Sequence, residues 1–437
     1  MNHVPVRRPG VAIDRHQLVR IQLREVVEGA WRRRARGRGH AVTTLPHHSL
    51  ISRSRISPTV LIGLLAVCIA ITFQILLPVV PVMMERVGPH GAAGAATAAL
   101  FFGAVTGELS TPWLLSRWTS RRVLIAAQVI TSVPSLVYLI PHASPWAMLA
   151  AASGRGLGMG VAIVISVVLI SELALPERRG TSIGFIGLAL SGPGIFVPSV
   201  GVFLLANGRS DLDALIAFGA GVAGGLVALR IPEQPVHLTE LERPTNLIGA
   251  LRRPGMFVIM AGYVLASCSF GGVVTYAPVA LPLDGLGSAA SFLLVSGATR
   301  AASRWLAGVI GDRRPSRIVL VGGMALSLAG LAVLAISSSV GAVLFAAVAY
   351  GAGYGAMQTA AYLAMSERGT RSDSGAISAL WNGGIDLGSS LGGSLIGLTA
   401  ASYGYAAAAW VLPGAVLLAV PLILWPAPAR TPIARRA

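Results

Sequence analysis

Lysine is absent from this sequence of 437 residues, and charged residues of all kinds make up only 12% of it. A soluble domain carries about 25% charged residues, whereas 54% of this chain is hydrophobic. The two cysteines, Cys68 and Cys268, lie in separate apolar runs, so we expect neither a disulfide framework nor a cysteine zinc site. These shortages exclude a soluble globular protein and a disordered one, and they predict a chain surrounded mostly by lipid.

Clusters of chemically reactive side chains are also missing. All eight histidines lie outside the apolar runs, and none forms a metal-spaced pair on a helix. A polytopic membrane enzyme, the alternative class, needs such a cluster at the membrane edge. The net charge of +17 comes without a nucleic-acid recognition motif. We therefore predict no catalytic residue, no metal, no bound cofactor and no nucleic-acid partner.

Twelve apolar runs of about 18 residues or more follow one another along the chain. Each is long enough to cross about 30 Å of hydrocarbon as a helix, and a helix satisfies its own backbone hydrogen bonds in lipid. We therefore predict an all-α membrane protein with twelve transmembrane helices. The runs are 58–83, 93–115, 122–140, 145–171, 182–205, 211–229, 255–282, 287–310, 317–338, 340–365, 374–400 and 402–426.

The arginines divide unevenly between the two sides of such a bundle. Twelve crossings place both termini on one side, and 29 of the 34 basic residues fall there, against only Arg86 and Arg209 on the other. Cytoplasmic loops carry an excess of basic residues. The sequence therefore predicts a protein of the plasma membrane with both termini in the cytoplasm.

Polar segments divide the chain into five predicted units. The first is rich in arginine and suits a basic amphipathic helix on anionic lipid; alternatively it is disordered or precedes the true start of translation. The units are a cytoplasmic tail (1–57), a six-helix half (58–229), a cytoplasmic loop (230–254), a second six-helix half (255–426) and a cytoplasmic tail (427–437).

The two halves repeat each other. The segment 154–158 (GRGLG) in the fourth run is echoed by 351–355 (GAGYG) in the tenth, and Arg122, which opens the third run, is echoed by Arg317, which opens the ninth. Parallel repeats imply a pseudo-two-fold axis along the membrane normal. We expect a site between the halves, near the middle of the membrane.

The loop after the second helix of each half carries a basic motif. The second half reads Gly308-Val-Ile-Gly-Asp312-Arg313-Arg-Pro-Ser-Arg317, and the first reads WLLSRWTSRR from Trp113 to Arg122. These loops resemble the Gly-x-x-x-Asp-Arg-x-Gly-Arg-Arg loops of the major facilitator superfamily, and the likeness covers roughly residues 58–426. In the first half, an arginine stands where the family has aspartate.

Three further segments carry the resemblance. The fourth run contains RGLGMG from Arg155 and ends near Glu172, the fifth contains SGPG from Ser191, and the eleventh contains Trp381-Asn-Gly-Gly-Ile-Asp386. The fifth-run segment is similar to an antiporter signature, and the eleventh-run segment is similar to a drug- and metabolite-exporter branch. The resemblance implies gating roles for these residues: Arg117, Arg121, Arg122, Asp312, Arg313, Arg317, Glu172, Glu367, Gly192 and Pro193.

Ionisable side chains inside apolar runs are costly, so they are candidates for function. Glu108 lies in the second run and Asp386 in the eleventh, and the resemblance implies that these two helices meet. Two neighbouring carboxylates in a low dielectric cannot both stay ionised cheaply, so we predict that Glu108 and Asp386 exchange protons. The alternative for Asp386 is a structural ion pair with Arg300 or Arg304.

Three arginines also lie within the runs. Arg155 is a candidate for binding an anionic substrate group, or alternatively for a structural pair that joins helices. Arg300 and Arg304 lie one turn apart on one helix face, and Arg304 alternatively reaches the cytoplasmic headgroups. Gly192-Pro193 is expected to form either a gating bend or a packing kink.

Polar and aromatic residues of the cavity-type helices suit an amphipathic organic solute, with packing in the core as their alternative role. They are Gln74, Tyr263, Tyr276, Tyr350, Tyr354 and Gln358.

These observations predict a monomeric secondary transporter. We expect a proton-coupled antiporter that exports a small organic molecule by alternating access, driven by the proton gradient. An importer or facilitator of metabolites with the same fold is the alternative.

Overall fold

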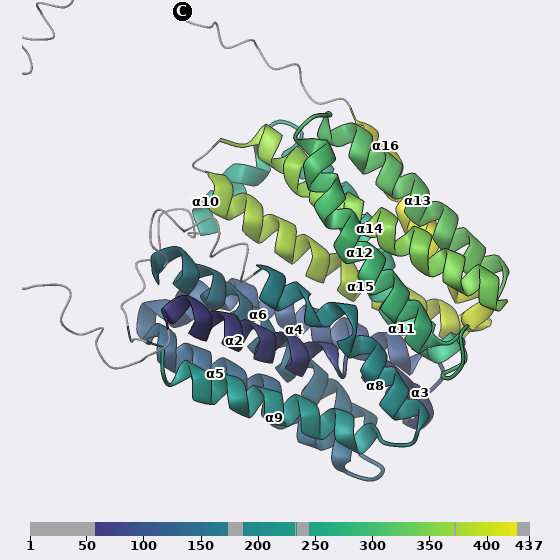
Figure 1. Cartoon of the computed structure of the whole chain (residues 1–437), viewed down its shortest axis with the longest axis horizontal. Coiled ribbons are helices and arrows are strands. Elements are labelled where there is room, and N and C mark those ends of the chain that lie inside the picture. The colour runs from purple at the N-terminus through teal and green to yellow at the C-terminus, as the bar shows by residue number, and fades with distance from the viewer. Residues whose placement is uncertain (1–56, 174–186, 232, 234–243, 371–372, 426–437) are drawn as a thin grey trace, which may run out of the picture. The chain divides into compact units, whose positions relative to one another are not determined.

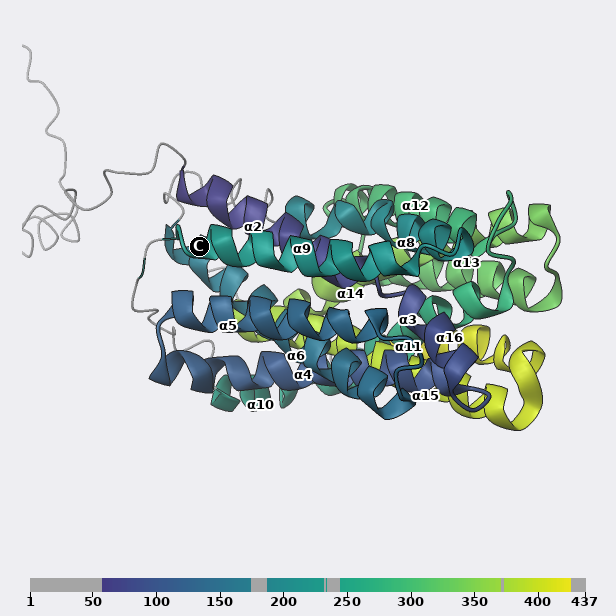
Figure 2. The same cartoon turned by 90° about the horizontal axis from the view of Figure 1, so that it is seen from below.

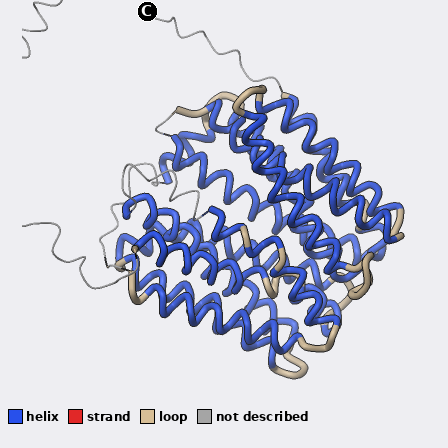
Figure 3. The backbone as a smooth tube through the Cα atoms, viewed as in Figure 1, coloured by secondary structure: helices blue, strands red, loops and turns tan. Residues whose placement is uncertain are grey.

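The computed structural model describes residues 57–173, 187–231, 233, 244–370 and 373–425. Within these ranges every regular element is a helix (Figure 3). The helices belong to one compact unit, Ile56–Ala437. The predicted tails, 1–57 and 427–437, lie outside the described residues except for Ser57.

The first half begins at α2 and ends at α9, shown in purple to teal in Figure 1. Its elements are α2 (Pro58–Gln74), α3 (Val79–Val87), α4 (Ala92–Arg117), α5 (Ser120–Ser132), the 3-10 helix η1 (Val133–Leu139), α6 (Pro145–Leu173), the 3-10 helix η3 (Pro193–Ile195), α8 (Val197–Ala206) and α9 (Ser210–Ala228).

The second half follows a short helix, α10 (Pro244–Leu251), inside the predicted loop 230–254. Leu247, Ala250 and Leu251 of α10 pack in one apolar cluster with residues of the second half. The elements of that half are α11 (Met256–Ala280), α12 (Ala289–Gly311), α13 (Ser316–Ile336), α14 (Val340–Arg368), α15 (Ser374–Ala408) and α16 (Val411–Leu424).

The helices follow the twelve predicted runs in order. Within the described residues, nine are long and apolar enough to cross a membrane, or ten if the bent pair α15–α16 is one span. The helix α12 is 23 residues long, but it contains Arg300 and Arg304, which lower its hydropathy. The predicted all-helical membrane architecture is confirmed.

Four of the predicted runs are interrupted, and one of these, the fifth run, breaks at η3 (Pro193–Ile195). The first breaks between α2 and α3 beside Pro78, which has no backbone N–H to donate. The third continues from α5 into η1, where Pro134 occupies the first turn. The eleventh extends past its predicted end at 400 to a break at Gly404, whose positive φ of 80° suits glycine, and α16 then turns by 96°.

Contacts between helices repeat from one half to the other. The helix α4 packs on α6 in the first half as α12 packs on α14 in the second. Gly156 of α6 lies against the carbonyl of Leu100, and Gly351 of α14 lies against that of Ser296. The contacts therefore match Gly351 with Gly156, two residues from the Gly154 of the sequence echo.

The two halves meet mainly through α4 against α15 and through α8 and η3 against α12. A Cβ atom at Gly94 of α4 would overlap the carbonyl of Gly393 in α15, so the two backbones touch there. Nearby, Ser390 donates a hydrogen bond to the carbonyl of Ala98 at 3.0 Å, and Thr275 of α11 donates to Thr97 of α4 at 2.7 Å.

The connections between helices gather at the two ends of the bundle (Figure 2). We call the end with the α4–α5, α12–α13 and α14–α15 connections the basic face, and the other end the opposite face. The basic face carries Arg117, Arg121, Arg122, Arg230, Arg252, Arg253, Arg313, Arg314, Arg317 and Arg368. The touching glycines of α4 and α15 lie near the opposite face.

Candidate functional site

A cavity of about 610 Å³ lies between the two halves. Its walls come from helices of both halves. In α12 and α15, the lining residues lie in the part of the helix nearer the basic face. Aromatic and polar side chains alternate around it: Phe73, Gln74, Phe101, Ser191, Phe270, Arg300, Arg304, Trp305, Gln358, Thr359, Trp381, Asn382 and Asp386. Such a lining suits a small solute with both apolar and polar groups.

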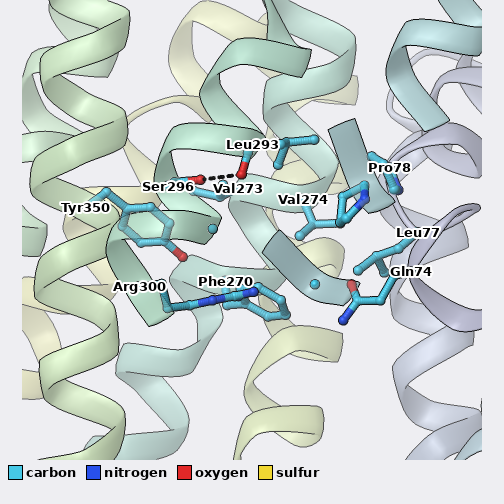
Figure 4. A pocket seen from close by; sticks show the side chains of 13 residues that line it. Gln74, Leu77, Pro78, Phe270, Val273, Val274, Leu293, Ser296, Arg300 and Tyr350 are labelled. Atoms are coloured by element: carbon cyan, nitrogen blue, oxygen red, sulfur yellow. Dashed lines mark hydrogen bonds between the residues drawn. The ribbon is translucent and has the colours of Figure 1, made fainter. Parts of the chain in front are cut away.

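A second, smaller cavity of about 30 Å³ continues from the first toward the opposite face. Gln74, Phe270 and Arg300 line both cavities, so the Arg300 side chain lies at the boundary between them. Figure 4 shows Arg300 extended along Phe270, with Gln74 on one side and Tyr350 on the other.

The two arginines of α12 contact aromatic rings. The guanidinium carbon of Arg300 lies 5.1 Å from the ring centre of Phe270, and that of Arg304 lies 5.6 Å from the ring centre of Trp381. Both side chains are half-buried. Asp386 forms no ion pair with either arginine in the described part of the chain, so the structural pair considered for it is not seen.

Glu108 and Asp386 come from opposite sides of the α4–α15 contact. A Cβ atom at Gly383, one turn before Asp386, would lie 3.6 Å from the Glu108 carboxylate. The Glu108 carboxylate therefore lies against α15 within one turn of Asp386. Asp386 lines the cavity, and neither carboxylate has a hydrogen-bonding or ion-pair partner among the side chains that the structure describes.

Arg155 is buried away from the large cavity, with only 1% of its surface exposed. Its guanidinium donates to the carbonyl of Thr72 at 2.8 Å and lies over the ring of Tyr138. Thr72 is near the end of α2, where the helix breaks. Arg155 thus joins α6 to this break, and its predicted contact with substrate has no support from the cavity lining.

The Gly192-Pro193 segment forms the start of η3. Next to it, Gly194 lies beside Gln74 and Arg300: a Cβ atom on Gly194 would be 3.0 Å from Gln74 Nε2 and 3.5 Å from Arg300 Nη2. This segment therefore lies beside Arg300, while its gating role stays a prediction.

The predicted aromatic and amide residues divide between cavity and core. Gln74 and Gln358 line the large cavity. Tyr354 stacks on Phe270 with ring centres 5.5 Å apart, and Tyr350 stacks on Tyr354 at 5.6 Å. The remaining two pack elsewhere: Tyr263 stacks on Trp381, and Tyr276 contacts Tyr405 near the opposite face.

On the basic face, equivalent arginines cap equivalent helices. Arg121 donates to the carbonyl of Ile231, just after α9, at 2.7 Å, and Arg317 donates to the carbonyl of Leu424, the last residue of α16, at 2.6 Å. By its contacts, Arg121 and not Arg122 corresponds to Arg317. Cationic side chains at helix C-termini satisfy free carbonyls.

Glu233 adds an acidic group to this cap in the first half. The Thr119 hydroxyl donates to it at 2.6 Å and lowers the pKa of Glu233, as do Arg121 and Arg122 to a smaller extent. This cluster ties the start of α5 to the segment after α9.

The other gating candidates make fewer contacts. Arg117 lies over the ring of Trp113 at 4.4 Å, and Glu367 accepts a hydrogen bond from Ser316 at 2.9 Å. The side chains of Asp312 and Arg313 are exposed on the α12–α13 connection. Glu172 lies near the end of α6, where side chains are outside the described part of the chain. The gating roles implied for these residues stay predictions.

One ionisable residue was missed by the sequence reasoning. Asp213, in the first turn of α9, is fully buried, and neither carboxylate oxygen has a hydrogen-bond partner within the described residues. Asp213 lies at the start of the predicted run 211–229 and was not named as a candidate. The spacing of Asp213, Ala217, Gly221 and Gly224 on one helix face was the available signal.

No group of three histidine, cysteine, aspartate or glutamate residues is arranged to hold a metal ion in the portion of the chain that the structure describes.

A family model described as "Major Facilitator Superfamily" matches residues 62–368 and 289–436. Among curated proteins, "Probable inositol transporter 3" of Arabidopsis thaliana is 27% identical over 159 residues, which are 35% of this chain and 26% of that protein. The chain therefore matches about a quarter of the length of this relative.

Solved structures with the same fold cover most of the chain. The nucleoside transporter NupG superposes with a TM-score of 0.66 at 13% identity, over 84% of this chain and 98% of its own. A D-xylose-proton symporter superposes with a TM-score of 0.64 at 18% identity, over 85% and 97%. A human organic anion transporter superposes with a TM-score of 0.58 at 15% identity, over 84% and 98%. At these identities the likeness establishes the fold.

Proposed function

Because this chain belongs to the Major Facilitator Superfamily, a family of membrane transporters and not of enzymes, we propose that it is a proton-coupled symporter that takes up a small polar metabolite. The observation that supports the coupling is the position of the Glu108 carboxylate against α15, one turn from Asp386, without a basic partner for either carboxylate among the described residues.

The physical argument for coupling rests on the cost of charge. A carboxylate in a membrane interior costs several kcal/mol when ionised, and a second carboxylate nearby adds to that cost. The two residues belong to different halves. When the halves move apart or together, the repulsion changes, and one carboxylate gains or releases a proton.

Uptake is supported by what the similar proteins are named for: inositol transport, nucleoside transport and D-xylose–proton symport. The competing mechanism is the export by antiport expected from the sequence, for which the glycine–proline segment at 192–193 is the supporting feature. The branch of the superfamily and the substrate are parts of this proposal.

Proteoliposomes with a pH-sensitive dye inside provide the test. D-xylose, myo-inositol, uridine and benzoate are added outside in turn, for the wild type, Glu108→Gln, Asp386→Asn and the control Asp284→Asn, which changes an exposed loop carboxylate. We expect acidification with at least one compound, a loss of about tenfold or more in the first two variants, and no loss in the control.

The sign of the pH change separates the mechanisms whichever way the protein inserts. Alkalinisation on substrate entry would mean antiport and overturn symport. Entry of radiolabelled compound without any pH change would mean facilitated diffusion, and Glu108 and Asp386 would then be structural.

A further inference from the structure

Arg300 and Arg304 present an unusual excess of positive charge to the cavity. The charged side chains of its lining are these two arginines and Asp386. Arginine stays protonated in proteins, so the lining is net positive even with Asp386 ionised. Neither arginine has a carboxylate within ion-pair distance in the described part of the chain.

The aromatic contacts hold the guanidinium groups without satisfying them. Phe270 lies under Arg300 at 5.1 Å and Trp381 lies near Arg304 at 5.6 Å. A ring face attracts the cation but accepts none of its five N–H donors in the plane. The half-buried guanidinium groups therefore keep N–H donors available toward the cavity, and an anionic oxygen pair satisfies two of them at once.

A second donor converges on the same place. The Cβ position of Gly194 lies 3.0 Å from Gln74 Nε2 and 3.5 Å from Arg300 Nη2. Glycine at 194 therefore lets the N–H groups of Gln74 and Arg300 converge beside its backbone, in the lining of the smaller cavity. Figure 4 shows the side chains of Gln74 and Arg300 in this lining. A methyl group at position 194 would crowd Gln74 Nε2.

We propose that this transporter carries a small organic anion. Its carboxylate or phosphate-monoester group binds between Arg300 and Gln74 beside Gly194, with Arg304 as the second positive charge. Its apolar body packs on the rings of Phe270 and Trp381. This inference rests on the proposed transport function and specifies the class of its substrate.

Isothermal titration calorimetry on the full chain in detergent tests the binding step without any proton gradient. The probes are benzoate, phenyl phosphate and the neutral amide benzamide. We expect at least one anion to bind with a Kd at least tenfold below that of benzamide. Arg300→Gln and Gly194→Ala are each expected to raise that Kd at least tenfold, the second because the added methyl group displaces the Gln74 amide.

Two matched variants control for general effects. Gly219→Ala adds a methyl group to open space on α9, away from the cavity, and Arg314→Gln removes an arginine from the exposed α12–α13 connection. Both are expected to leave the Kd unchanged. Gel filtration checks folding, and Arg304→Gln replaces Arg300→Gln if the latter aggregates.

The proposal is overturned if benzamide binds as tightly as the anions, if no anion binds, or if Arg300→Gln and Gly194→Ala leave the Kd unchanged. Binding of dioctanoyl phosphatidate alone would identify a lipid headgroup instead of a water-soluble anion and would also overturn it. Anion binding that survives without proton-coupled flux would contradict the proposed coupling while leaving the substrate class intact.

Discussion

Some residues of this protein matter because they lack a side chain, and others because of the groups that their side chains carry. Gly94 of α4 allows the backbone of α15 to touch α4 near the opposite face, where a side chain would overlap the Gly393 carbonyl. The halves are held closed at this end by backbone contact and two hydrogen bonds. Opening at this face requires α4 and α15 to separate.

A larger residue at 94 is therefore expected to favour the separated state. Overpacking costs about 1–3 kcal/mol, so Gly94→Val should raise the accessibility of a cysteine at 97 about tenfold. The measurement is the rate of maleimide labelling of Thr97→Cys in a variant without Cys68 and Cys268. Gly225→Val adds bulk where nothing lies nearby and should label at the original rate. An unchanged rate in Gly94→Val would mean that the contact does not limit opening.

The sequence alone does not show which charged residues of the apolar runs face a cavity and which are paired in the core. The cost of burying charge identified Arg155 and Arg300 alike as candidates. Only the structure separates them, because Arg155 has backbone carbonyls to bind at the α2 break, whereas Arg300 faces the cavity.

At the scale of elements, the start of α15 depends on one carboxylate. Asp373, just before the helix, accepts hydrogen bonds from the Thr370 amide and hydroxyl and pairs with Arg253 at 2.7 Å. Burial acts to raise the pKa of Asp373, but these hydrogen bonds and the arginine lower it overall. The ionised form is therefore the one that holds α15 to the segment after α10.

The pH dependence follows from the direction of this shift. A carboxylate with a lowered pKa in the folded state contributes stability that is present above about pH 3.9, its unfolded value, and is lost as the pH falls through the folded value. Asp373→Asn should show that loss already at pH 7, by less than about 1 kcal/mol. Hydrogen exchange of the amides at 374–380 measures it. Asp211→Asn, beside exposed Arg209, is the control, and equal exchange in both variants would contradict a role for Asp373.

The helix breaks belong to the same scale. The break beside Pro78 falls inside the run 58–83, which was predicted as one helix; proline cannot donate a backbone hydrogen bond. The break at Gly404 was not foreseen, since glycine is frequent throughout the chain and only the turn between α15 and α16 requires the positive φ.

Over the whole molecule, the uneven arginines predict that the basic face lies in the cytoplasm. In cells, a cysteine replacing Ser338, on the opposite face, should react with a membrane-impermeant maleimide. A cysteine replacing Ser116, on the basic face, should react only after permeabilisation. Both positions are exposed, and native cysteines are replaced in both variants. The reverse labelling pattern would invert the orientation.

The internal repeat gives the bundle its pseudo-symmetry and also shows where the halves differ. Ala104 of α4 and Arg300 of α12 contact a glycine of the fourth helix of their own half in the same way. One turn further on, Glu108 stands where the second half has Arg304. The proposed proton site and the proposed anion site thus occupy related positions of opposite charge.

Local chemistry was enough to establish the class of protein, the order of its helices and the short set of charged candidates. Charged side chains and unpaired backbone groups are unfavourable in lipid, so membrane-spanning helices can be recognised in the sequence as long apolar runs. Which candidates meet was a matter of three-dimensional packing. Successive residues of a helix are rotated by about 100° about the helix axis, so the orientation of a helix decides which of its side chains face a neighbour. The approach of Glu108 to Asp386 and the convergence of Gln74 and Arg300 on Gly194 therefore depend on how helices distant in sequence pack together.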